Sequence, residues 1–328
     1  MKNQLSKKIF IWIALAAIIY LLFLIWADYR IIIKAFKEIN LFYIPLILGL
    51  VLVNYLLRFL KWDYYLKTLK IKVKKSDSFF IFFSGLSMSI TPGKMGELLK
   101  CYLLKKTTKT PMSYSSSVII AERITDFISL IIICIAGAYY AQYGREAVLA
   151  CGALFIIFVL LLSSKKTSLK IISLLENIKF LEKYIKKIHI AYESTYELIK
   201  IKPLLITVII SLIGWCSECL GFYMIFSSFA VPIEIPILLA SFIYAFSTLF
   251  GALLLVPGGL GITEGSMTGL LVLLGKISLN YSFTIMFIGR AATLWFAVFI
   301  GSLALLYYQK KIHIPKDEIE NFNQEKNE

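Results

Sequence analysis

The sequence predicts an all-α polytopic membrane protein. Its composition, its long apolar runs and the uneven placement of its lysine and arginine residues all indicate this class. Hydrophobic residues make up 59% of the 328 residues, charged residues make up only 17%, and the mean hydropathy is +0.79. A water-soluble fold needs a larger share of polar residues to cover its surface. The composition therefore excludes a soluble domain.

The scarcity of histidine and cysteine excludes several chemistries. His189 and His313 lie in charged stretches, so no His-based metal site or catalytic triad is expected within the membrane. Cys216 and Cys219 have the spacing of a redox pair, but they fall in the middle of an apolar run without a βαβ context. We expect the cysteines to be buried thiols that pack as small apolar residues.

Apolar runs of about 17–25 residues can cross a bilayer as helices. About six full spans are predicted: Ile9–Trp26, Leu41–Leu60, Ser115–Tyr140, Ala147–Ser163, Pro203–Phe229 and Ser282–Tyr308. Basic residues precede the first run, as in a signal peptide, but its length and the lack of a small-residue cleavage site predict a retained anchor.

Two further apolar regions are interrupted by proline and glycine. The first runs over Phe79–Ile90, breaks at Thr91–Gly93 and resumes over Met95–Leu104; the second runs over Ile237–Val256, breaks at Pro257–Gly259 and resumes over Ile262–Gly275. Each is predicted to be a helix, a break and a second helix. Each can therefore enter and leave the membrane on the same side, as a broken re-entrant hairpin.

Lysine and arginine residues indicate the orientation, because cytoplasmic loops carry an excess of them. With a cytoplasmic N-terminus and two re-entrant hairpins, 26 of the 35 fall in cytoplasmic segments and 5 in exterior segments. The cytoplasmic segments are residues 1–8, 61–75, 100–109, 165–202 and 310–326. Both termini are therefore predicted to lie in the cytoplasm, with the chain in the cytoplasmic (plasma) membrane. This distribution explains the net charge of +15 without a nucleic-acid partner.

Residues 1–308 are predicted to form a single transmembrane domain, followed by a polar cytoplasmic tail at 309–328. Between its halves, residues 165–200 place isoleucine and leucine at three- and four-residue steps with lysines between them. This pattern predicts an amphipathic helix on the anionic cytoplasmic leaflet. The alternative is a solvated helical connector.

The two halves, repeat 1 at about 41–140 and repeat 2 at about 203–308, share an order of features and run in opposite directions. Their equivalent acidic and basic residues have equal spacing: 26 residues separate Glu97 from Arg123, and 26 separate Glu264 from Arg290. Arg58 corresponds to Glu218 when Ile71 is matched to Val231. Inverted repeats of this kind build many transporters. Coincidence is the alternative, because one pair of equal spacings carries little information.

Nine ionisable residues fall at or near bilayer depth: Arg58, Lys94, Glu97, Glu122, Arg123, Asp126, Glu218, Glu264 and Arg290. Each costs about 2.5–3.5 kcal/mol in the middle of a membrane helix, so they are expected to face one another or a hydrated cavity. Arg123 and Asp126, three residues apart, are predicted to pair on one helix.

The breaks at Pro92-Gly93 and Pro257-Gly258-Gly259 each precede a new helix, and the first N–H groups of a helix lack partners. Two such helix N-termini in the membrane, flanked by Arg123 and Arg290, predict an anion site for a phosphate group. Glu97 and Glu264, in the first turns of these helices, are expected to cap them or to pair with the arginines. The alternatives are breaks that only kink a helix and Glu–Arg pairs that only clamp helices together.

Three motifs resemble one family: Thr91-Pro92-Gly93-Lys94-Met95-Gly96-Glu97-Leu98-Leu99-Lys100, Glu122-Arg123-Ile124-Thr125-Asp126 and Pro257-Gly258-Gly259-Leu260-Gly261-Ile262-Thr263-Glu264. They resemble the lysylphosphatidylglycerol synthase transmembrane region, or flippase-like domain, over roughly residues 8–308. The resemblance implies movement of lipid-linked anionic head groups across the membrane. Bifunctional members carry a soluble aminoacyl-transferase domain, and only about 20 residues follow the last predicted helix here. Aminoacyl transfer is therefore not expected.

The leading hypothesis is translocation of an anionic phospholipid or a polyprenyl-phosphate-linked substrate, without a cofactor, a catalytic residue or a metal ion. The candidate substrate-binding residues are Arg58, Pro92, Gly93, Lys94, Gly96, Glu97, Glu122, Arg123, Asp126, Glu218, Pro257, Gly258, Gly259, Gly261, Glu264 and Arg290. A homo-oligomer or a separate lipid-modifying enzyme is a possible partner. The alternatives are a membrane-embedded enzyme of glycosyl or acyl (including aminoacyl) transfer to lipids and a membrane scaffold that transports nothing.

Overall fold

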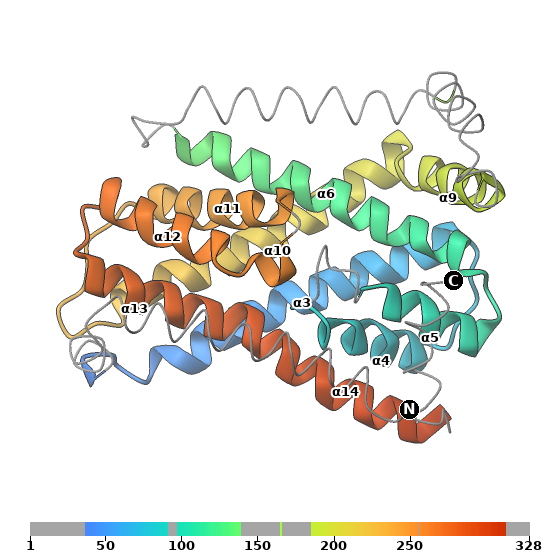
Figure 1. Ribbon diagram of the computed structural model, residues 1–328, viewed down its shortest axis with the longest axis horizontal. Coiled ribbons are helices and arrows are strands. Elements are labelled where there is room, and N and C mark those ends of the chain that lie inside the picture. Colours follow the sequence, from blue (N-terminus) through green and yellow to red (C-terminus); the bar gives the residue numbers. More distant parts are fainter. Residues whose placement is uncertain (1–36, 91–96, 139–164, 166–184, 255, 313–328) are drawn as a thin grey trace.

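The structure is a computed structural model, and it describes residues 37–90, 97–138, 165, 185–254 and 256–312. Within these ranges it is helical apart from one isolated β-bridge (Figure 1). The α-helices are α3 (Tyr43–Thr68), α4 (Lys75–Leu86), α5 (Leu98–Thr108), α6 (Met112–Ala138), α9 (Ile185–Leu198), α10 (Ile201–Ser227), α11 (Ile237–Leu253), α12 (Ile262–Leu273), α13 (Leu279–Arg290) and α14 (Phe296–Ile312). The predicted spans Ile9–Trp26 and Ala147–Ser163 lie outside the described residues, as does the tail from residue 313.

Three helical stretches in the described part of the chain are long and apolar enough to cross a membrane: Tyr43–Thr68, Ile201–Ser227 and Leu279–Lys311. The last comprises α13, a π-helical turn at Ala291–Trp295 (η4) and α14. Helix α6 is similarly long but carries three charged residues, Glu122, Arg123 and Asp126, near its middle. All four helices coincide with predicted spans, so the all-helical membrane class is confirmed.

The distribution of side chains is that of a protein with an apolar exterior. One face of α3 exposes Leu46, Val53, Leu56 and Leu60, each 43–53% accessible. Charged and hydroxyl side chains lie buried between the helices instead. Soluble monomers rarely expose such continuous apolar faces, whereas a bilayer accommodates them.

Helices α3 and α10 pack against each other along their length in antiparallel fashion. An antiparallel bridge joins Ile39, just before α3, to Phe229, just after α10. Gly214 and Gly221 of α10 face α3, where added Cβ atoms would lie 3.2 Å from the Asn54 side chain and 3.6 Å from Leu50. Small residues of this kind let membrane helices approach closely. The opposite directions predicted for these two spans are thus observed.

Both interrupted regions contain pairs of helices that pack together. Helix α4 packs on α5, and α11 packs on α12 across the short 3-10 turn Pro257–Gly259 (η3). Because α4 follows α3 and α11 follows α10, and α3 and α10 are antiparallel, the two pairs begin at opposite ends of the bundle (Figure 1). Helices α11 and α12 begin at the predicted residues, and the other boundaries in these regions differ by two to four residues, as expected where a break is located only by its proline.

The predicted amphipathic segment 165–200 is described only at residue 165 and from residue 185 onward. Its second part forms α9, which packs against α6 and buries Tyr192 and Leu198. This part is therefore attached to the helical bundle rather than being a solvated connector.

Candidate anion-binding cavity

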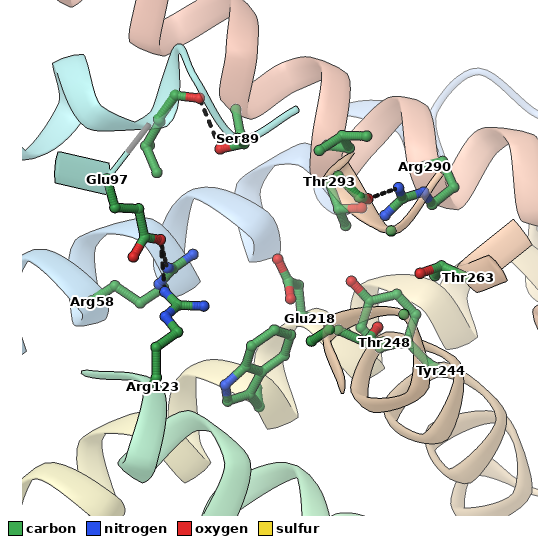
Figure 2. Close-up of a pocket in the computed structure, with 18 of the residues that line it drawn as sticks. Arg58, Ser89, Glu97, Arg123, Glu218, Tyr244, Thr248, Thr263, Arg290 and Thr293 are labelled. Atoms are coloured by element: carbon green, nitrogen blue, oxygen red, sulfur yellow. Dashed lines mark hydrogen bonds and ion pairs between the residues drawn. The ribbon is translucent and has the colours of Figure 1, made fainter. Parts of the chain in front are cut away.

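A cavity of about 240 Å³ lies between the helices where α3, α6, α10 and α11 meet η3 and η4 (Figure 2). Its charged lining residues are Arg58, Glu97, Arg123, Glu218 and Arg290. Its other lining residues include Tyr55, Ser89, Trp215, Tyr244, Thr248, Gly258, Gly259, Thr263 and Thr293. All three predicted arginines therefore line one cavity, although 232 residues separate Arg58 from Arg290 in the chain.

At one side of the cavity, two arginines share a single carboxylate (Figure 2). Arg123 of α6 donates from Nη2 to Oε1 of Glu97 at 2.7 Å, and Nη2 of Arg58 on α3 lies 3.6 Å from the same oxygen. Glu97 is the residue immediately before α5. The predicted pairing of Glu97 with an arginine is confirmed. A charge-assisted hydrogen bond of this length is among the stronger ones in proteins.

At the other side, Arg290 is held at the break between α11 and α12. Its Nε donates to Oε1 of Glu264 at 2.7 Å, and its Nη2 donates to the carbonyl oxygen of Gly258 at 2.6 Å. The second oxygen of Glu264 accepts the backbone N–H of Gly261 at 2.7 Å, at the start of α12. Gly258, Gly259 and Gly261 all have positive φ, which a residue with a side chain rarely adopts. Glu264 thus both caps its helix and pairs with Arg290, as predicted.

Glu218 of α10 lies between these two clusters on the cavity wall (Figure 2). Two tyrosines also line the cavity: Tyr55 of α3 and Tyr244 of α11, two helices that both pack on α10. Tyr55 donates its hydroxyl to the carbonyl oxygen of Thr293, inside the π-helical turn. Because a π-helical turn disturbs the regular backbone hydrogen bonds, this side chain satisfies a carbonyl group at the cavity.

Three of the predicted acidic site residues, Glu122, Asp126 and Glu264, do not line the cavity. Asp126 lies behind it, where Oδ1 accepts from Nζ of Lys61 at 2.6 Å and from the Ser211 hydroxyl at 2.6 Å. Trp215 donates to the same oxygen at 3.3 Å. The predicted contact of Asp126 with Arg123 is present, but at 3.6 Å it is the longer of its two ion pairs.

Glu122 pairs with Lys100 at 2.6 Å, in a second buried ion pair. The ammonium group of Lys100 also lies 4.8 Å from the centre of the Trp62 ring and 5.2 Å from that of Phe82, so aromatic faces supply part of its surroundings. Glu122 therefore neutralises a lysine between α5 and α6 rather than facing the cavity.

The assignment of Lys61 and Lys100 to cytoplasmic loops was wrong. Lys61 is 0% exposed and Lys100 is 2% exposed, and both lie inside the helical bundle. Sequence reasoning missed them because they stand at the polar ends of apolar runs. The sequence contained a signal for Lys61. It follows Arg58 by three residues, so the two cations lie on the same face of the helix.

The prediction of a helix N-terminus at the second break is qualified by one bond. The N–H of Gly261, the residue before α12, is bonded to the Glu264 carboxylate and is not available to a ligand. Pro257 starts η3, and Gly261 precedes α12 without lining the cavity. The residues of the other break, Pro92, Gly93, Lys94 and Gly96, lie outside the described residues.

Several lining residues were not predicted, although helical spacing connects them to the charged ones. Tyr55 precedes Arg58 by three residues, Trp215 precedes Glu218 by three, and Thr293 follows Arg290 by three. Residues three apart share a helix face, so the residue three positions from each charged residue could have been predicted to line the same cavity.

The described cysteines are all free thiols. Cys101, Cys134 and Cys219 are buried as expected, whereas Cys216 is exposed on α10, contrary to the prediction. Among the described residues, no group of three or more His, Cys, Asp or Glu side chains is placed to bind a metal ion.

The family described as the lysylphosphatidylglycerol synthase TM region matches residues 11–301, which include every element of the cavity. The chain belongs to this family. Its membership agrees with the apolar exterior and the long helices, and it makes the chain a multi-pass membrane protein.

Curated proteins similar to this chain include UPF0104 membrane proteins of three organisms. The UPF0104 membrane protein MJ1078 of Methanocaldococcus jannaschii is 27% identical over 70% of this chain and 97% of its own length. A UPF0104 membrane protein of Methanothermobacter thermautotrophicus is 26% identical over 77% of this chain and 81% of its own. PH1989 of Pyrococcus horikoshii, also a UPF0104 membrane protein, is 24% identical over 92% of this chain and 98% of its own.

Proposed function

We propose that this family member moves an anionic lipid, or a lipid-linked phosphate head group, across the cytoplasmic membrane. The observation that supports this function is the cavity itself, in which three arginines and two glutamates surround one space inside a bundle with an apolar exterior. Charged side chains at this depth are costly unless they face one another or a polar ligand. Arginine is the side chain best suited to phosphate, because its planar group donates two parallel hydrogen bonds.

The proposal includes a transmembrane arrangement. We infer that α4–α5 and α11–α12 are re-entrant hairpins that enter from opposite sides, that the halves at about 41–140 and 203–308 are inverted repeats, and that both termini are cytoplasmic. The antiparallel α3 and α10, and the opposite starting ends of the two hairpins, support this arrangement. In such proteins the substrate site lies at the interface of the repeats, which is where the cavity lies.

In this mechanism the chain's own residues bind and release a head group without changing it covalently. A phosphate would be attracted to the cavity arginines, while the acyl or polyprenyl chain would stay in the lipid beside the bundle. The chain contains no phosphate-binding loop for a nucleotide, so an ion gradient or the lipid gradient itself would supply the energy. Anionic lipids are the proposed ligands. A second copy of the chain or a separate lipid-modifying enzyme is the proposed protein partner.

The test is lipid movement in liposomes that contain the purified full-length chain. Fluorescent phosphatidylglycerol and a fluorescent polyprenyl phosphate are placed in both leaflets, and a membrane-impermeant quencher reports how fast the inner pool reaches the outside. We expect faster movement of at least one anionic probe than in protein-free liposomes, and a slower rate with R123Q. No acceleration of any anionic probe would contradict the proposal, whereas a covalently altered lipid in the same samples would favour an enzyme.

Reporter labels on each terminus of the chain in cells test the predicted cytoplasmic position of both termini.

A further inference from the structure

The two arginine clusters of the cavity differ in how completely their hydrogen-bond donors are used. At the η3 end, Nε and Nη2 of Arg290 donate to Glu264 and to the carbonyl oxygen of Gly258, at 2.7 and 2.6 Å. Glu264 in turn uses its second oxygen on the Gly261 N–H. These bonds join three parts of one structure: the end of α13, the glycine turn and the start of α12. A guanidinium group bonded in this way is fixed to the protein.

At the α5 end, the donors are largely unused. Arg58 makes no hydrogen bond to any of the described residues, and its shortest ion-pair distance is 3.6 Å, to Glu97. Nε of Arg123 is buried and has no hydrogen-bond partner, while its Nη2 donates to Glu97. The Arg58 and Glu97 side chains are only 14% and 9% exposed. A guanidinium group in such a place needs acceptors, because leaving buried donors unbonded is costly.

The charges at the α5 end do not cancel among the cluster residues. Arg58 and Arg123 carry two positive charges, and Glu97 supplies one negative charge between them. Asp126 approaches Arg123 to 3.6 Å, but Lys61 neutralises it at 2.6 Å. At the η3 end, Arg290 and Glu264 form an ion pair at 2.7 Å. Glu218, on the cavity wall between the two clusters, also acts electrostatically on Arg58, so the α5 end is distinguished by its unused donors rather than by its net charge.

We propose that Arg58 and Arg123 form the anion subsite of the cavity and that Glu97 is its internal counter-ion, displaced when a phosphate group binds. Arg290 is instead a positioning residue that holds the glycine turn against α13. This inference rests on the proposed function for the cavity, and it assigns the binding to one of the two clusters.

The ligand chemistry follows from the two guanidinium groups. The Arg58 and Arg123 groups approach one oxygen of Glu97 from two helices. A tetrahedral group with several oxygens can accept hydrogen bonds from both guanidinium groups at once. The Glu97 carboxylate contacts both of them through a single oxygen. A phosphate monoester or diester has this chemistry, whether it is a lipid head group or free phosphate. A zwitterionic head group would bring its own cation toward two arginines and would bind less well.

The experiment measures ligand binding to the purified full-length protein in a neutral detergent, at constant ionic strength, by calorimetric titration. The probes are inorganic phosphate and phosphatidylglycerol with two six-carbon chains. Each lost charge-assisted hydrogen bond corresponds to roughly a tenfold change in affinity, so R58Q and R123Q should each weaken binding by about tenfold or more. E97Q should strengthen binding, because it removes the competing carboxylate. R58K and R123K, which keep the charge but lose the planar fork, should fall between wild type and the glutamine variants.

Two controls separate binding from folding. K311Q removes an exposed ion pair with Asp77, far from the cavity, and should bind as wild type does. R290Q should lower the unfolding temperature and should weaken binding less than R123Q does.

Equal losses in R290Q and R123Q would overturn the assignment, as would unchanged or weaker binding in E97Q, or no binding of either probe to the wild-type protein. Binding of inorganic phosphate alone would keep the subsite but count against a lipid cargo. Lipid movement in liposomes that is unaffected by R58Q and R123Q would refute this inference and leave the proposed function standing.

Discussion

Nε of Arg290 lies 2.7 Å from Oε1 of Glu264, 26 residues earlier in the chain. The same separation connects Glu97 and Arg123, whose side chains are also joined at 2.7 Å. In both cases the glutamate stands at the start of the second helix of an interrupted pair, and the arginine stands on the helix that follows. The equal spacing in the sequence is therefore matched by equivalent ion pairs, which favours the repeat over coincidence.

The Glu264 pair predicts a large effect on stability. Because Glu264 is 0% exposed and its partner is nearly buried, E264Q leaves a guanidinium group without its counter-ion and should lower the free energy of unfolding by about 3–5 kcal/mol. Denaturant unfolding of the detergent-solubilised protein, followed by tryptophan fluorescence, measures this loss. E97Q is the matched comparison and should cost clearly less, because its partners Arg58 and Arg123 are 14% and 23% exposed. Equal losses of unfolding free energy in E264Q and E97Q would contradict this prediction, because the two ion-pair clusters would then contribute equally to stability.

The buried pair of Lys61 and Asp126 predicts strong coupling. K61M leaves the Asp126 carboxylate with hydroxyl and indole donors and with Arg123 at 3.6 Å, and it should destabilise the protein by about 3–5 kcal/mol. The double variant K61M/D126N should recover part of this loss, giving a coupling energy of roughly 0.5–3 kcal/mol in a double-mutant cycle. The exposed pair Lys311–Asp77 is the control and should couple by about 0–1 kcal/mol. Additive effects at Lys61 and Asp126 would contradict the prediction.

Close packing of α14 on α4 predicts an intolerant glycine. A Cβ at Gly301 would collide with the backbone at Leu86 and Ser87, so G301A should destabilise the protein by about 1–3 kcal/mol despite the better helix propensity of alanine. Gly269 of α12 has no atom within 4 Å of an added Cβ, so G269A should be neutral or stabilise by up to about 1 kcal/mol. Thermal unfolding of the two variants side by side checks the contrast. A stable G301A protein would show that α14 and α4 are less tightly packed.

The hydroxyl of Tyr55 predicts a smaller effect. Y55F removes the hydrogen bond to the carbonyl oxygen of Thr293 and should cost about 0.5–1.5 kcal/mol of unfolding free energy. Tyr223 of α10 has no hydrogen bond through its hydroxyl among the described residues, so Y223F is the control and should have no measurable cost. If Y55F matches Y223F, the π-helical turn does not depend on this bond.

Much of the fold was predictable, because apolar length and period identify membrane helices regardless of their neighbours. The runs that became α3, α6, α10 and α13–α14 were located to within a few residues, except at the C-terminal end of α3. That helix continues through Lys61 and Asp63 to Thr68. Lys61 pairs with Asp126 inside the bundle, and Asp63 pairs with the exposed Lys67 one turn further along the same helix. A hydropathy pattern does not show where such a helix ends, because it treats every charged residue as solvent-exposed.

The sequence by itself determined the membrane class, the two interrupted regions and the set of charged residues that needed partners. Each of these follows from composition and from spacing along a helix. The tertiary structure alone decided which charge meets which. Lys61 and Lys100 pair with Asp126 and Glu122 away from the cavity, and the Glu264 carboxylate accepts the N–H of Gly261 at the start of α12. The physical reason is that an ion pair forms over a few ångströms between residues on different helices, and only the packing of those helices sets that distance.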